Sequence, residues 1–72
     1  MSGVIIKWCV FTPAYGEQYS YGSDTTEVQA HSRREALVIG LRVLRALGSR
    51  WIQDQQSDGR NPFNGLKAEP LE

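Results

Sequence analysis

The clearest pattern of apolar and polar positions runs from Ser32 to Leu47 and ends at Gly48. Apolar residues recur there every three or four positions, which is the period of an α-helix. Ser32 and Glu35 have the spacing of a capping box, in which the glutamate reaches back to the N–H of Ser32. Gly48 stands where a helix closes on a left-handed residue. The pattern predicts one helix over residues 32–47.

The apolar positions of this helix cover an arc of about 220°, whereas packing on one sheet needs only about 100°. Three leucines form its central stripe, and smaller or branched residues widen it. The stripe is Leu37, Leu41 and Leu44, and the flanking positions are Ala36, Ile39, Gly40, Val43, Ala46 and Leu47. We therefore expect apolar surface to remain for self-association or for a partner.

Two strands precede the helix. Residues 4–11 are apolar on both alternating faces and rich in Val, Ile, Trp and Phe, which predicts a central strand. The face with Ile5, Cys9 and Phe11 is either covered or meets a partner. Residues 25–30 alternate, with Val28 and Ala30 on the buried side, which predicts a second strand with one wet face.

The strand-to-helix junction carries the pattern Val28-x-Ala30-x-Ser32-x-x-Glu35-Ala36-Leu37. This pattern resembles small phage-encoded proteins that bind host enzymes, and equally small accessory subunits of multicomponent enzymes. The resemblance implies an adaptor or modulator of a larger protein. It covers only residues 28–37, and no functional residue is carried over from either group.

After Gly48, residues 50–56 allow two interpretations. Trp51 and Ile52 predict a short third strand, which Gly48-Ser49 favours because such a pair usually stops a helix. The alternative is a helix that continues through Gly48. With the strand, the chain is an α+β domain of order ββαβ over residues 1–56, in which one amphipathic helix packs across an antiparallel sheet of about three strands.

Residues 57–72 contain turn signals at Gly59, Asn61-Pro62 and Asn64-Gly65. They predict a flexible C-terminal tail that adds little to stability, with at most Phe63 or Leu66 docking back. The terminal Leu71-Glu72 resembles the junction left before a purification tag.

The formal charge is zero, from eight basic and eight acidic residues, but residues 31–50 carry five arginines against one glutamate. One cysteine excludes an internal disulfide and favours a reducing compartment. No apolar run approaches the ~20 residues of a membrane span, and the N-terminus lacks the features of a signal peptide. We expect a soluble, cytoplasmic protein that does not bind membranes.

The residues give little support to catalysis. A nucleophile–base pair would need Cys9 or a hydroxyl together with His31, the single histidine of the chain. One cysteine and one histidine do not supply the three or four ligands of a typical zinc site, and the glycines form no phosphate loop or dinucleotide fingerprint. We predict a non-enzymatic protein without cofactor or metal.

The candidate binding residues are a row on the helix and two tyrosines in the loop of residues 14–24. The row is Arg34, Val38, Arg42 and Arg45, and the tyrosines are Tyr19 and Tyr21. Spacings of four, four and three put the row on one exposed side of the helix, where it is either a solvated basic face or a contact surface. The tyrosines either pack over the core edge or act as interface contacts.

These residues favour a protein-interaction module that binds an acidic protein surface, or a second copy as a homodimer. The alternative is a nucleic-acid-binding domain that uses the helix arginines and stacks bases on the loop tyrosines. The neutral total charge counts against the alternative, because nucleic-acid affinity depends on neutralising phosphates.

Overall fold

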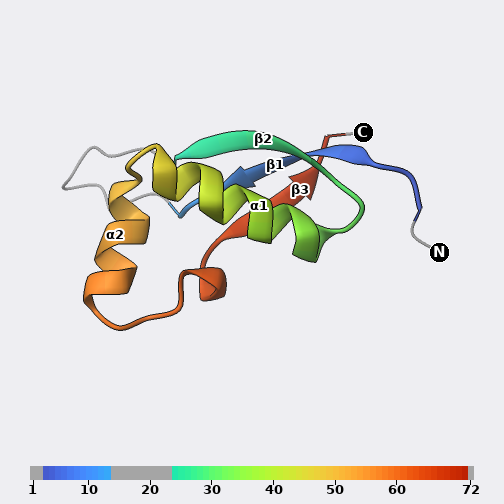
Figure 1. Ribbon diagram of the computed structural model, residues 1–72. Coiled ribbons are helices and arrows are strands. Elements are labelled where there is room, and N and C mark those ends of the chain that lie inside the picture. Colours follow the sequence, from blue (N-terminus) through green and yellow to red (C-terminus); the bar gives the residue numbers. More distant parts are fainter. Residues whose placement is uncertain (1–2, 14–23, 72) are drawn as a thin grey trace.

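Three antiparallel strands form one sheet in the order β2-β1-β3 in the computed structural model, which describes residues 3–13 and 24–71 (Figure 1). β1 (Ile6–Phe11) lies between β2 (Thr25–Ala30) and β3 (Lys67–Pro70). Helix α1 (Arg33–Ala46) packs across one face of the sheet. The short helix α2 (Arg50–Ser57) and the 3-10 turn η2 (Pro62–Asn64) lead from α1 to β3. The predicted α+β class, with a helix across an antiparallel sheet, is confirmed.

The two faces of β1 differ as strand alternation requires. Trp8, Val10 and Thr12 are buried on the α1 side. On the opposite side Cys9 and Phe11 are half-buried, and polar residues stand directly beside them in the register. Glu27 and Glu69 flank Cys9, and Thr25 and Lys67 flank Phe11. Ile5, the third residue predicted on this face, is exposed, so the open face is an apolar line framed by polar side chains.

Two small residues and one leucine form the buried face of α1. Ala36, Gly40 and Leu44 are its buried residues. A Cβ atom built on Gly40 would lie 2.5 Å from Cγ1 of Val10, so the missing side chain lets the helix backbone approach the central strand. The predicted stripe is wrong in this respect, because Leu37 and Leu41 lie only half-buried at the flank.

α1 ends as predicted, but the segment after Gly48 differs from the prediction. Gly48 has a φ of 84°, its N–H donates to the carbonyl of Arg45, and the N–H of Ser49 donates to the carbonyl of Leu44. This is a Schellman closure. Ser49 then caps α2 at once, because its Oγ accepts from the N–H of Ile52 at 3.4 Å.

The predicted third strand over residues 50–56 is therefore wrong, and so is a helix running through Gly48. Trp51 and Ile52 enter the core from a second helix. The reason lies in Ser49, whose hydroxyl also donates to the Asp24 carboxylate at 2.7 Å and so ties the turn to the start of β2. A hydroxyl directly after the closing glycine is a start signal for a new helix.

The third strand comes instead from the segment predicted to be a flexible tail. Residues 67–70 pair antiparallel with β1, and the N–H of Leu71 donates to the carbonyl of Lys7 at 2.9 Å. Leu66 and Ala68 are buried in the core, and Pro62 is buried in η2. The segment escaped prediction because it is short and ends in a proline, which a strand tolerates mainly at a sheet edge.

Candidate functional site

The row Arg34, Val38, Arg42 and Arg45 lies on the side of α1 that faces away from the sheet, and all four residues are exposed. Figure 1 shows α1 lying across one face of the sheet, with its outer side turned away from the strands. Helical periodicity alone places these residues together, because positions three and four apart share a face. The structure thus gives one continuous exposed strip with three positive charges.

The three arginines of the row lack acidic partners among the described residues. The ion pairs found there join His31 to Glu35 and Arg50 to Asp54. Arg33 is also engaged, since its guanidinium lies 5.9 Å from the centre of the Trp8 ring. That contact accounts for a cation at the start of the helix, where the dipole disfavours it. Of the helix arginines, Arg33 therefore has a structural role, which the sequence did not reveal.

A groove between α1 and η2 adjoins the row. It has a volume of about 340 Å³ and is lined by Arg34, Leu37, Val38 and Phe63. Val38 is 37% exposed and Phe63 is 39% exposed, so the groove presents apolar surface to solvent from both of its walls. The sequence named Arg34 and Val38 as candidate contact residues and Phe63 only as a residue able to dock back, and it did not predict the groove that brings the three together. The available signal was Asn61-Pro62, a cap followed by proline that starts a helical turn.

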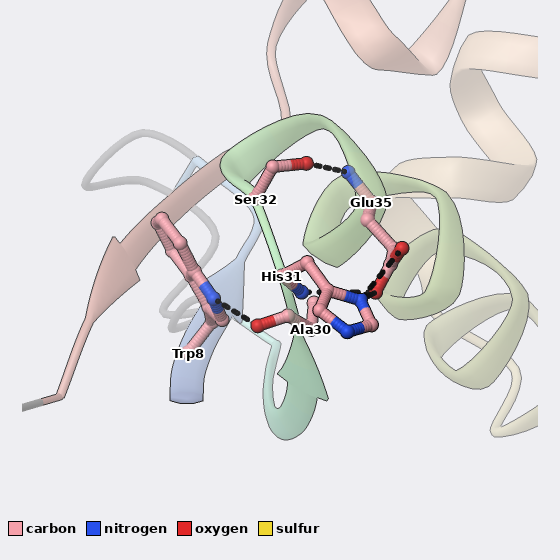
Figure 2. A network of polar contacts seen from close by, with 5 residues as sticks. All are labelled: Trp8, Ala30, His31, Ser32 and Glu35. Atoms are coloured by element: carbon pink, nitrogen blue, oxygen red, sulfur yellow. Dashed lines mark hydrogen bonds and ion pairs between the residues drawn. The ribbon is translucent and has the colours of Figure 1, made fainter. Parts of the chain in front are cut away.

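His31 and Glu35 form a local contact at the start of α1 (Figure 2). The Ser32 Oγ accepts from the N–H of Glu35 at 3.2 Å, as the capping box predicts. The Glu35 carboxylate, however, accepts from the N–H of His31 at 2.9 Å and lies 3.1 Å from its Nδ1, one residue earlier than predicted. The Trp8 Nε1 donates to the Ala30 carbonyl beside this junction.

These contacts predict a pH dependence. The N–H of His31, followed by its ring and charge, holds the pKa of Glu35 below the ordinary value of 4.5. Because the folded pKa lies below the unfolded one, ionised Glu35 stabilises the fold above about pH 4.5, and this contribution disappears as the pH falls through the folded pKa. In urea unfolding at several pH values, Glu35→Gln should flatten the acid limb relative to the wild type. Glu69→Gln is the matched control, and equal slopes for the wild type and Glu35→Gln would contradict the assignment.

A second, smaller hollow of about 120 Å³ lies where the α1–α2 turn meets the start of β2. Leu47 lines it and is 73% exposed, and the Asp24–Ser49 hydrogen bond lies at its wall. The predicted contact residues Tyr19 and Tyr21 lie outside the described residues. The structure therefore brings Arg34, Val38, Arg42 and Arg45 together and does not place the tyrosines relative to them.

Comparison with known proteins finds no family model that matches the chain, no similar protein among those of curated function and no similar solved structure. Within residues 3–13 and 24–71, no three His, Cys, Asp or Glu side chains are placed to hold a metal ion. None of the helices in those ranges has the length and apolar character needed to cross a bilayer.

Proposed function

We propose that this chain is a non-enzymatic protein-interaction module that binds an acidic protein surface through the outer row of α1. The observation that carries the proposal is the row itself: Arg34, Arg42 and Arg45 are exposed with no described carboxylate partner, and they surround the exposed Val38. Such a strip offers charge for orientation and an apolar contact for affinity. The protein would act as an adaptor or modulator of a larger protein.

The chain has one cysteine and cannot form an internal disulfide, which supports the cytoplasm as its place of action. Isolated surface charges contribute well under ~1 kcal/mol to folding, so the row adds little to stability. In a desolvated contact, a charge-assisted hydrogen bond is worth more, on the scale of 1–3 kcal/mol.

Charge reversal in the row tests the proposal. Arg42→Glu and Arg45→Glu should each leave the circular dichroism spectrum unchanged, because both side chains are exposed. Arg45→Glu should lower Tm by no more than a few degrees, since Arg45 lies in the last turn of α1, where the helix dipole favours a cation. Affinity for the partner, first identified by pull-down and mass spectrometry, should fall at least about tenfold per position, the equivalent of ~1.4 kcal/mol. Val38→Asp should act in the same direction, because it puts an unpaired charge into the contact.

Lys67→Glu is the matched control, since Lys67 is exposed on β3 and neighbours the buried Ala68, so that it points to the sheet face opposite α1. It makes the same charge change on the other side of the molecule. The proposal would be wrong if the three variants are folded and still bind the partner fully. The row would then be a solvated face that does not contact the partner.

The alternative function is nucleic-acid binding, which the same arginines favour. Binding to a short oligonucleotide at two salt concentrations separates the two. Phosphate contacts would make the affinity fall steeply with salt, whereas a module specific for an acidic protein surface would bind the oligonucleotide weakly at both concentrations.

A homodimer is the third possible arrangement. Light scattering over a tenfold range of protein concentration would reveal it as an average mass that rises with concentration.

A further inference from the structure

The groove beside the row has properties that the row alone does not explain. The short segment around η2 buries Pro62 and Leu66 in the core but leaves the Phe63 ring exposed between them. The backbone that carries the ring is nevertheless held in place, because the Asn61 Oδ1 accepts from the N–H of Phe63 at 3.0 Å and the Asn61 carbonyl accepts from the N–H of Asn64. An exposed aromatic on an anchored turn is a preorganised contact.

The size of the groove limits its occupant. Its volume of about 340 Å³ is near the lower end of the range of about 300–1,000 Å³ for ligand pockets. Leu37 forms the inner wall and packs against the core, so this side of the groove is fixed. The groove therefore accommodates one large apolar side chain better than an extended cofactor.

The positive charge of Arg34 indicates which chemical group of the ligand lies beside that apolar side chain. Arg34 lines the groove and is the second residue of α1, so its positive charge adds to the positive end of the helix dipole. No acidic residue lines the groove, and Arg34 has no carboxylate partner in the described part of the chain. An apolar ligand alone would leave this charge without a counter-charge.

We infer that the groove receives a single aromatic or large aliphatic side chain of the partner, and that a carboxylate next to it pairs with Arg34. This inference rests on the proposed function. It specifies the part of the partner that binds the groove, here called the anchor, as a protein segment in which a Trp, Phe or Leu stands beside an Asp or Glu. The apolar side chain lies between Val38 and Phe63 and against Leu37. The carboxylate forms a charge-assisted, bidentate contact with the guanidinium of Arg34.

The test uses two small probes with the same ring. Indole-3-propionate carries the carboxylate, and tryptamine carries an ammonium group on a similar linker. In a titration followed by nuclear magnetic resonance, indole-3-propionate should shift the amides of Leu37, Val38 and Phe63 with a dissociation constant of roughly 1 mM. Tryptamine should bind at least about tenfold more weakly, because its charge is repelled by Arg34.

Two variants localise the probe. Phe63→Ala should reduce the affinity for indole-3-propionate several-fold, and its exposed position keeps the fold intact. Arg34→Gln should remove the preference for indole-3-propionate over tryptamine. Equal binding of the two probes, shifts centred elsewhere on the surface, or no binding at concentrations about tenfold above the expected constant would each overturn the inference. Tighter binding of a short oligonucleotide than of indole-3-propionate at these same amides would also overturn it, in favour of nucleic acid.

The result of this experiment is independent of the result of the charge-reversal test of the row. If indole-3-propionate binds at the groove while Arg42→Glu and Arg45→Glu keep full partner affinity, the groove stands and the row is wrong. If the probe does not bind but both reversals still release the partner, the row stands and the anchor is wrong.

Discussion

A chain that ends at Ser57 is expected to be unfolded at 25 °C. The missing residues include β3, which pairs with the central strand, and the buried Pro62, Leu66 and Ala68. Burial of one leucine side chain contributes about 1.5–3 kcal/mol, and a domain of this size has only roughly 4–11 kcal/mol in total. Loss of β3 also turns β1 into an edge strand and uncovers the core on that side.

Circular dichroism and thermal melting provide the measurement for this truncation. The control is a chain that ends at Pro70, which keeps all of β3 and loses the hydrogen bond from Leu71 to Lys7. It should melt within a few degrees of the full chain. A cooperative transition for the chain ending at Ser57, close to that of the full chain, would mean that the C-terminal segment is dispensable and that β3 contributes nothing to the core.

The second large effect is expected at the closest approach between α1 and the sheet. In Gly40→Ala the new Cβ would lie 2.5–2.7 Å from three side-chain atoms of Val10. Val10 is fully buried in the central strand and has no room to move, so α1 must shift away from the sheet. Overpacking of this kind costs about 1–3 kcal/mol. We expect a net loss of stability even though alanine is the better helix former by about 1 kcal/mol.

Denaturant unfolding measures this loss, and Val10→Ala provides the control. That change removes the two Cγ atoms that the new methyl group would meet, although the Cβ of Val10 stays within 2.7 Å of it. The double variant should therefore be more stable than the sum of the two single losses implies, by about 0.5 kcal/mol or more. A stabilising Gly40→Ala, or strictly additive losses, would show that the helix does not meet the strand here.

The sequence predicted those elements whose signals are local. Ser32 and Gly48 define the two ends of α1, and alternation at Val28 and Ala30 identifies β2, because caps and periodicity depend only on neighbouring residues. The exposed row of α1 was predictable for the same reason, since helical spacing fixes which side chains share a face. Whether that row binds a partner stays a prediction.

The last strand, and the choice between two local signals at Ser49, depended on distant contacts. Ser49 can end α1 with Gly48 or cap a new helix, and its hydrogen bond to Asp24, 25 residues away in the chain, holds it where its Oγ caps α2. Residues 67–70 have little strand character of their own. They become β3 because β1 offers an unpaired edge, and the backbone ladder, with Leu66 and Ala68 in the core, supplies the stability.

The groove was likewise decided by the tertiary structure. The sequence by itself determined that Arg34 and Val38 share the outer side of a helix, but Phe63 is distant in the chain and joins them only because η2 leads into β3. The sequence also could not determine which apolar positions of α1 face the sheet, since its arc was wide enough for several orientations. In the structure Ala36, Gly40 and Leu44 face the sheet, and the absence of a side chain at Gly40 lets the helix backbone lie close to Val10.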